Sequence, residues 1–163
     1  MSVAEAPSSN MPYEDRFKLI ASVYAFLIRD GRILLLRRQN TGYEDGNFGL
    51  VAGHHDGCET LRQAMQREAR EEAGLVIGDN DLELALTMHR WCGDHERLDV
   101  FFAVNKWQGE IANAEPDKCS ELTWFPLDRL PENIIGYIAA AIDCFRRGEK
   151  YCEFGWAECR REE

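Results

Sequence analysis

The chain has 163 residues, of which 45% are hydrophobic, and a formal net charge of −10. These values suit one soluble globular domain. The acidic balance argues against binding to a nucleic-acid polymer, because such binding depends on lysine and arginine side chains that neutralise many phosphates. A small phosphorylated substrate remains compatible with it if metal ions bridge the charge. The first residues contain neither a basic start nor an apolar run, so we expect a cytoplasmic protein with no membrane partner.

The six cysteines show no C-x-x-C spacing of the kind that binds zinc or serves redox chemistry. In a domain of this size without an export signal, we expect free and mostly packed thiols. Cys152 and Cys159 flank an aromatic-rich segment and form the one pair in which a bond would be worth testing.

Residues 1–14 are rich in Ser, Pro, Ala and Glu without periodicity, which predicts a mobile N-terminal arm. We expect residues 15–148 to form the domain and residues 149–163 to form a C-terminal tail. The tail mixes aromatic and charged residues without a clear period. It therefore either packs back on the domain or contacts a second subunit.

Two apolar runs between residues 17 and 38 flank the pair Asp30-Gly31, which is a strong signal for a β-hairpin. Arg37 and Arg38 end the second run and precede a polar, glycine-rich loop. Two interpretations of these arginines remain open: they bind substrate at the strand end, or they are solvated side chains.

Residues 61–73 predict an amphipathic helix that follows a short strand at residues 48–52. Thr60 and Gln63 have the spacing of a capping box, and Gly74 is a natural stop. The apolar stripe that would seat the helix consists of Leu61, Ala64, Met65 and Ala69.

Glu68, Glu71 and Glu72 share one face of this helix at spacings i, i+3 and i+4. Their charges repel one another and lie at the negative end of the helix dipole. One interpretation is a solvated face in which Arg67 pairs with Glu71 at i, i+4. The other is a set of oxygen ligands for Mg²⁺ or Mn²⁺. The spacing alone does not decide between them.

The remaining elements are two strands, a short strand and a helix. Their expected ranges are 82–91, 97–107, 122–125 and 132–147, with a turn at 92–96. The complete order is therefore β, β, β, α, β, β, β, α. Because the links between strands are short, we expect an α/β fold with a mixed, largely antiparallel sheet and a helix on each face.

The run Arg67-Glu-Ala-Arg-Glu-Glu-Ala-Gly-Leu75, with Gly53 and Glu59 at fixed distances before it, resembles the full signature of the Nudix hydrolase family. The resemblance implies an α/β/α sandwich and metal-assisted attack of water on the pyrophosphate linkage of a nucleoside diphosphate joined to a group X. One departure is Val51-Ala52-Gly53, followed by His54-His55, where many members have Pro-Gly-Gly at the loop entry. These histidines either contact phosphate or metal or are bystanders.

The resemblance also assigns roles to single residues. Eight residues after Trp107, Glu115 corresponds to a loop glutamate that joins the metal site in the MutT-like branch and is a candidate general base. Gly53 would let the chain approach closely, and Arg67 and Glu59 would hold the ligand carboxylates in place. The implied metal ligands are Glu68, Glu71, Glu72, Glu115 and the backbone carbonyl of Ala52, and the implied catalytic set is Glu115, Arg67 and Glu68.

The segment from Glu115 to Cys119, followed by Trp124, resembles branches that cleave purine nucleoside triphosphates, often oxidised ones. Asn133 lies near the position where that branch reads the base, although a helix-start role is also open. We therefore expect a Mg²⁺-dependent hydrolase, with Mn²⁺ as a possible substitute, that converts a (deoxy)nucleoside triphosphate to a nucleoside monophosphate and pyrophosphate, as a monomer or homodimer.

Two alternatives stay open. One is a pyrophosphatase of the nucleotide-sugar or ADP-ribose type, although Arg90-Trp91 stands where the ADP-ribose branch usually has a proline. The other, from a different class, is a non-catalytic module that binds a nucleotide as a sensor. The intact acidic pattern argues against the sensor, because a degenerate module does not need all the ligands.

Overall fold

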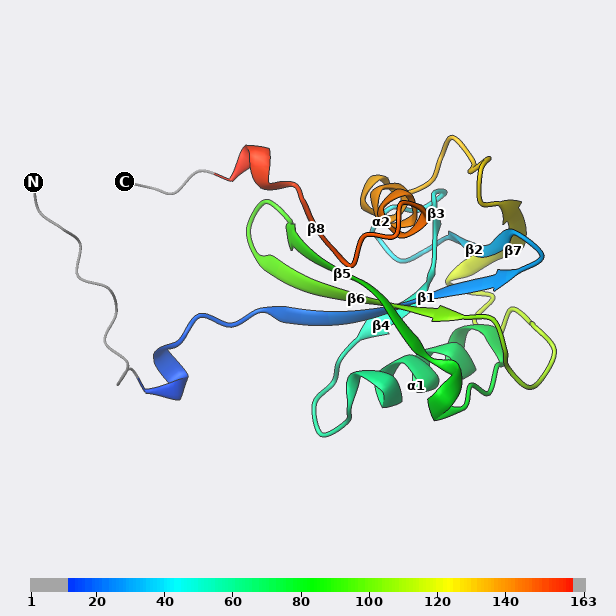
Figure 1. The fold of residues 1–163 in the computed structure, drawn as a ribbon, viewed down its shortest axis with the longest axis horizontal. Coiled ribbons are helices and arrows are strands. Elements are labelled where there is room, and N and C mark those ends of the chain that lie inside the picture. The colour runs from blue at the N-terminus through cyan, green and yellow to red at the C-terminus, as the bar shows by residue number, and fades with distance from the viewer. Residues whose placement is uncertain (1–11, 160–163) are drawn as a thin grey trace, which may run out of the picture.

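The computed structural model describes residues 12–159, which fold around one eight-stranded mixed sheet. Helix α1 (Leu61–Ala73) covers one face of the sheet and helix α2 (Gly136–Arg146) covers the other (Figure 1). This arrangement confirms the predicted α/β/α sandwich. Residues 1–11 of the predicted mobile arm lie outside the described residues.

The main path of the sheet is β3-β2-β1-β6-β5-β8, with β4 beside β1 and β7 beside β2. The pairs β1/β6 and β5/β8 are parallel, and the other pairs are antiparallel. The strands are β1 (Ile20–Arg29), β2 (Arg32–Arg38), β3 (Phe48–Gly49), β4 (Val51–His54), β5 (Glu83–Trp91), β6 (Glu96–Val104), β7 (Cys119–Pro126) and β8 (Tyr151–Phe154). Short 3-10 turns occupy Tyr13–Asp15, Asp79–Asp81 and Trp156–Glu158.

The predicted hairpin joins β1 and β2, and both turn residues, Asp30 (φ 51°) and Gly31 (φ 71°), have positive φ. A two-residue turn with this backbone matches the natural twist of the strands. The two strands pair only at Ile28–Ile33 and Arg29–Arg32. Further back, the same edge of β1 pairs with β4, which therefore lies at an edge of the sheet.

Several boundaries differ from the sequence prediction: β6 ends at Val104 and not at residue 107, and β7 begins at Cys119 and not at residue 122. The expected single strand at residues 48–52 is two strands, β3 and β4. The second helix begins at Gly136 and not near residue 132, because the backbone of Asn133 and Ile135 is hydrogen-bonded to that of Phe48. The tail contributes β8, which pairs with β5, so this segment packs back on the domain.

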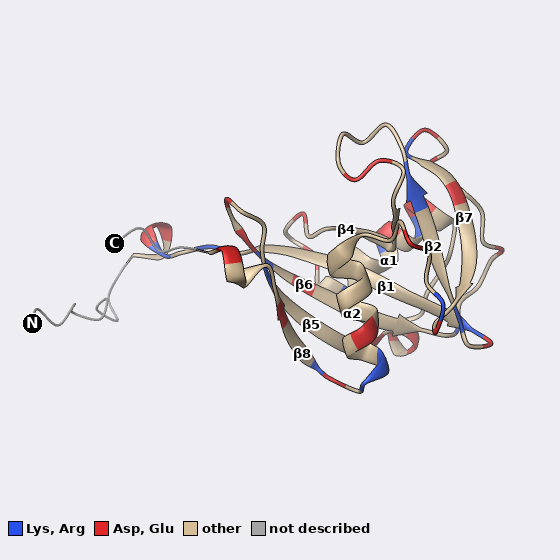
Figure 2. Cartoon of the chain, turned by 90° about the horizontal axis from the view of Figure 1, so that it is seen from above, with Lys and Arg blue, Asp and Glu red and all other residues tan. Residues whose placement is uncertain are grey.

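Each helix seals a separate apolar core. Four small or flexible residues of α1 are buried against one face, and the capping box of Thr60 and Gln63 forms as predicted. Helix α2 has no charged residue before Asp143 and packs on the other face through its apolar side chains (Figure 2). Neither helix within residues 12–159 has the length and apolar content needed to cross a membrane.

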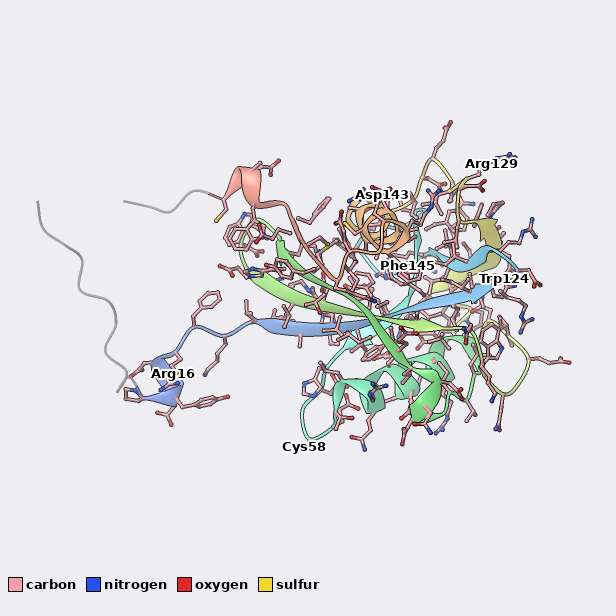
Figure 3. The ribbon with its side chains drawn as sticks, viewed as in Figure 1. Arg16, Cys58, Trp124, Arg129, Asp143 and Phe145 are labelled. Atoms are coloured by element: carbon pink, nitrogen blue, oxygen red, sulfur yellow. The ribbon has the colours of Figure 1, made fainter. Side chains whose placement is uncertain are left out.

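All six cysteines are free. Cys58 is exposed on the loop before α1 (Figure 3). Burial raises the pKa of both Cys144 on α2 and Cys152 on β8, and each of these two thiols also shifts the pKa of the other. The neighbour of Cys152 is therefore Cys144, whereas the sequence pointed to Cys159.

Candidate functional site

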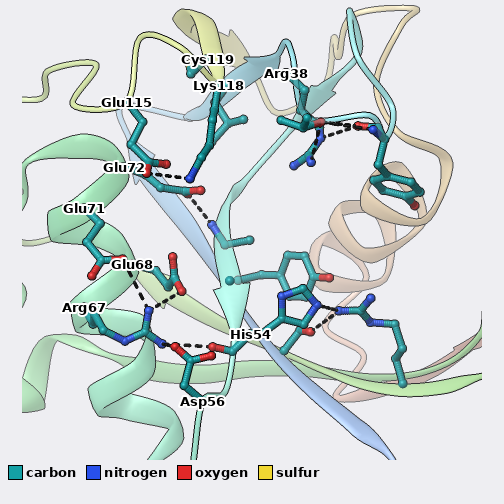
Figure 4. A pocket seen from close by; sticks show the side chains of 18 of the residues that line it. Arg38, His54, Asp56, Arg67, Glu68, Glu71, Glu72, Glu115, Lys118 and Cys119 are labelled. Carbon is teal, nitrogen blue, oxygen red and sulfur yellow. Dashed lines mark hydrogen bonds and ion pairs between the residues drawn. The ribbon is translucent and has the colours of Figure 1, made fainter.

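A pocket of about 640 Å³ surrounds the edge strand β4. On the α1 side of β4 the lining includes four glutamates, which we call the acidic cluster: Glu68, Glu71, Glu72 and Glu115. On the other side, the lining includes a group of hydrogen-bond donors, which we call the donor cluster: Ser22, Tyr24, Arg90, Arg97 and Tyr137. Figure 4 shows the acidic cluster on one side of the β4 ribbon and His54 on the other.

Strand β4 holds the acidic cluster through its backbone. The Ala52 N–H donates to Glu72 Oε2 at 2.9 Å. A Cβ at Gly53 would overlap the carboxylate of Glu68. Only glycine therefore lets Glu68 lie against the strand. The departure from Pro-Gly-Gly at this loop entry, Val51-Ala52-Gly53, keeps the glycine that the close approach requires.

Arg67 ties the helix to the loop that follows β4. Its guanidinium contacts Glu59 at 2.8 Å and Glu68 at 2.6 Å, and it donates to the carbonyl of His54 at 3.1 Å. It also lies 3.5 Å from Glu71 at i, i+4, so the ion pair of the solvated-face interpretation is present as well. The hydrogen bond from Arg67 lowers the pKa of Glu59. Arg67 and Glu59 thus form a brace beside the acidic cluster.

Glu115 reaches the cluster because its loop is fastened to the end of α1. The carbonyls of Glu72 and Ala73 have no partner within the helix, as is usual for a last turn. They accept hydrogen bonds from the N–H groups of Ala114 and Ala112, each at 3.1 Å. Glu115 itself is 2.9 Å from the ammonium group of Lys118.

The acidic cluster carries negative charge that the chain does not balance. Burial, together with the charges of Glu68 and Glu115, raises the pKa of Glu72 to about 8, against the lowering effect of the Ala52 hydrogen bond. Burial also raises the pKa of Glu68, against Arg67. Within residues 12–159, no ion pair joins Glu72 to a basic side chain. A bound cation would relieve this repulsion.

The chemistry of the cluster fits a hard divalent cation, which prefers carboxylate and carbonyl oxygens. Across the described part of the chain, no three His, Cys, Asp or Glu side chains converge into a ready-made metal site. Arg67 and Lys118 occupy oxygens of Glu68 and Glu115. The residues for a metal site are therefore gathered in one pocket, with basic side chains against three of them, Glu68, Glu71 and Glu115.

The three predicted substrate-binding residues lie in different places. Arg38 lines the pocket and donates to the Tyr43 carbonyl and the Thr41 hydroxyl. Arg37 and Asn133 are not among the lining residues, and both donate to the carbonyl of Gly46, at 3.0 and 2.8 Å. They support the loop at residues 39–47, which carries Tyr43 to the pocket wall.

The two histidines also differ. The His54 ring lines the pocket and lies 2.6 Å from the Arg97 guanidinium, and burial and Arg97 lower its pKa. The His55 ring bonds to the Glu59 carbonyl at 2.6 Å, within the loop before α1. His55 thus stabilises the loop, whereas His54 faces the pocket.

The sequence prediction missed the donor cluster. Arg90 and Arg97 lie on β5 and β6 and are direct cross-strand partners. The two arginines lie at equal distance from the observed turn at residues 92–95, which is one residue shorter than the predicted turn at 92–96. That symmetry predicts pairing only if the hairpin register is already known, so no pattern in the sequence identifies the cluster.

Three comparisons with known proteins agree on one family. A family model described as NUDIX domain matches residues 18–142. The chain is 28% identical over 106 residues to an oxidized purine nucleoside triphosphate hydrolase of Danio rerio, covering 64% of this chain and 65% of that protein. It is 29% identical over 125 residues to an NAD-capped RNA hydrolase NudC of Chromobacterium violaceum, covering 77% of this chain and 44% of that protein.

The fold is similar to that of a MutT NUDIX hydrolase from Burkholderia pseudomallei, with a TM-score of 0.70 and 28% identity. That match covers 78% of this chain and 98% of the other. The chain thus spans nearly all of this solved structure, but only 65% and 44% of the two relatives above.

Proposed function

Because the chain belongs to the NUDIX family, we propose that it is a Mg²⁺-dependent pyrophosphohydrolase that converts a (deoxy)nucleoside triphosphate to a nucleoside monophosphate and pyrophosphate. The observation that carries this proposal is the gathering of four carboxylates in one pocket around β4, two of them with raised pKa values. Such a cluster is stable with its carboxylates ionised only when positive charge is supplied.

In this proposal Glu68, Glu71, Glu72 and Glu115, with the carbonyl of Ala52, hold the metal. When bound, Mg²⁺ or Mn²⁺ would neutralise phosphate charge and lower the pKa of a water molecule. Arg67 and Glu59 keep the Glu68 carboxylate in position through the brace described above.

The reaction breaks the bond between one phosphorus atom of the α,β bridge and the bridging oxygen, while water forms the new P–O bond. Glu115 accepts the proton of the attacking water, and the bridging oxygen leaves with one of the two products. Lys118 and Arg38, which line the same pocket, contact the phosphate oxygens. Arg37 and Asn133 act indirectly, by supporting the loop that presents Arg38 and Tyr43.

A nucleotide panel with purified protein tests the proposal. We expect nucleoside triphosphates to yield monophosphate and pyrophosphate with Mg²⁺, and we expect EDTA to abolish the reaction. ADP-ribose, a nucleotide sugar, NAD and an NAD-capped RNA oligonucleotide are the comparison substrates. The proposal is wrong if triphosphates stay intact while one of these four is cleaved.

The NAD-capped RNA oligonucleotide is among the comparison substrates because the relative from Chromobacterium violaceum is named an NAD-capped RNA hydrolase. The net charge of −10 disfavours a long RNA contact. The sensor alternative predicts that nucleotide binds without turnover of any substrate in the panel.

A further inference from the structure

The donor cluster contains two arginines, and a single carboxylate, that of Asp99, lies close to both. Arg90 and Arg97 are directly opposite each other on β5 and β6, a placement that destabilises an antiparallel pair when the charges are alike. Asp99, fully buried, accepts from Arg90 Nε at 2.5 Å, while its other oxygen is 3.8 Å from Arg97 Nε. These three side chains together carry one surplus positive charge.

Arg97 is the less satisfied of the two arginines. Its Nε is the one buried side-chain nitrogen or oxygen among residues 12–159 that has no hydrogen-bond partner. Its Nη2 lies 2.6 Å from the Ser22 hydroxyl and 2.6 Å from the His54 ring. Arg90, in contrast, is buried against the ring of Tyr137, at 3.7 Å from its centroid, and paired with Asp99. Arg97 is also the more exposed of the two, with 16% of its side chain accessible against 7% for Arg90, so its Nη groups, and not its buried Nε, are the donors that can reach a ligand.

The groups that face the pocket here are mainly donors. The guanidinium groups only donate, whereas the Tyr24 hydroxyl gives its proton to Asp99 and accepts from Arg90, so it does not donate to a ligand. Aromatic surface lies close by, since Tyr137 lines the same pocket and the half-exposed Tyr43 lies in its wall. A flat ligand with an edge of acceptors fits these features, because it can contact the rings and accept from Arg97.

We propose that the donor cluster selects 6-oxopurine nucleotides, with Arg97 as the specificity-determining residue. This inference rests on the proposed function, because the phosphates must occupy the acidic side of β4 for the base to reach the donor side. Guanine and hypoxanthine present adjacent O6 and N7 acceptors, which arginine recognises well. Adenine and cytosine place an amino donor at that edge, which would face another donor. In 8-oxoguanine N7 carries a hydrogen, so that base loses one of the two acceptors.

Product binding, measured with Mg²⁺ present to neutralise the acidic cluster, tests the inference without turnover. The probes are GMP, IMP, AMP and CMP, titrated calorimetrically into the full chain and into Arg97→Met, which keeps the apolar stem. We expect the wild-type protein to bind GMP and IMP about 10-fold more tightly than AMP and CMP. Arg97→Met should lose this preference while its affinity for AMP stays unchanged. Arg97→Lys, which keeps the charge, should retain part of the preference.

The matched control is Arg129→Met, an exposed arginine far from β4 (Figure 3). It should bind all four nucleotides as the wild type does. Equal wild-type affinity for the four nucleotides overturns the inference, and so does an equal loss for all four in Arg97→Met. The inference is also overturned if NADP binds more tightly than NAD to the wild type but not to Arg97→Met. The donor cluster would then bind the additional phosphate of NADP and not a base.

Hydrolysis of dGTP, dITP, dATP and 8-oxo-dGTP separates this inference from the proposed function. Preference for dGTP and dITP over dATP and 8-oxo-dGTP supports both. Equal turnover of all four leaves the proposed function standing and removes the inference. If no triphosphate is cleaved but GMP binding still depends on Arg97, the inference stands and the proposed function fails.

Discussion

The two sides of the pocket are built in opposite ways. The acidic cluster comes from one helix and one loop that is hydrogen-bonded to the end of that helix. The donor cluster comes from strands β1, β5 and β6 and from α2. The first is therefore a local structure that a contiguous motif can encode, whereas the second exists only when the sheet register is formed.

The two sides also differ in charge. On the acidic side, carboxylates crowd together and burial raises the pKa values of Glu68 and Glu72. On the donor side, the buried Asp99 is paired with Arg90, and positive charge is left over at Arg97. A nucleotide bound across β4 would bring acceptors to the donor side, and its phosphates would bring negative charge to the acidic side. The acidic side should therefore depend on metal, and the donor side should not.

Glu72→Gln should give the largest effect. It removes a ligand from the acidic side, and metal-ion catalysis contributes several kcal/mol, so we expect turnover to fall on the order of 10⁴-fold. The rate with Mg²⁺ and the apparent Mg²⁺ affinity are measured together. Glu110→Gln, an exposed glutamate outside the pocket, is the control and should behave like the wild type. Unchanged metal affinity in Glu72→Gln would exclude Glu72 as a ligand.

Arg90→Met should have the next largest effect, on stability. The change leaves Asp99 as a buried charge without its close partner, which costs about 3–5 kcal/mol. Urea denaturation measures this loss. The double variant Arg90→Met with Asp99→Asn should recover most of it, because no buried charge remains. A stability loss below about 1 kcal/mol in the single variant would show that the pair does not support the fold.

Features that depend on local signals in the sequence were predicted well. The turn at Asp30-Gly31, the capping box and the apolar stripe of α1 each depend on neighbours within a few residues, and all three are present. The same locality brings Glu68 and Glu72 to one pocket. Glu115 was found through a spacing, and the structure supplies the reason, since its loop satisfies the last carbonyls of α1.

Elements that depend on distant contacts were harder to predict. The start of α2 is set by backbone hydrogen bonds to Phe48, more than 80 residues away in the chain. The tail as a sequence has no clear period, and β8, whose residues alternate between exposed and half-buried, forms because the edge of β5 offers hydrogen-bonding partners. Arg90 and Arg97 became neighbours through the β5–β6 register. In each case the deciding partner lies outside the local window.

Glu115→Gln tests the acidic side at its second component, the loop. If Glu115 accepts the proton of the attacking water, turnover should fall about 10²-fold or more. Because Glu115 is also paired with Lys118, the variant should be compared with Lys118→Met, which breaks the same ion pair but keeps the carboxylate. Asp117→Asn, exposed on the same loop, is the charge-matched control. Equal rates for Glu115→Gln and Asp117→Asn would remove Glu115 from the mechanism.

Thr60→Ala should give the smallest effect and separates helix stability from site chemistry. The Thr60 hydroxyl accepts the Gln63 N–H at 3.2 Å, so its loss should destabilise the protein by about 1 kcal/mol. Thr60→Ser keeps the hydroxyl and should lie within a few tenths of a kcal/mol of the wild type. Both are measured by urea denaturation, and turnover is measured well below the transition.

We expect turnover per folded molecule to stay unchanged in Thr60→Ala, because the acidic cluster is fixed by β4 and by the last turn of α1 and not by the first turn. If turnover fell in parallel with stability, fraying at the start of α1 would reach Glu68 and Glu72. The acidic side would then be one cooperative unit with its helix, and its difference from the donor cluster would lie in rigidity as well as in charge.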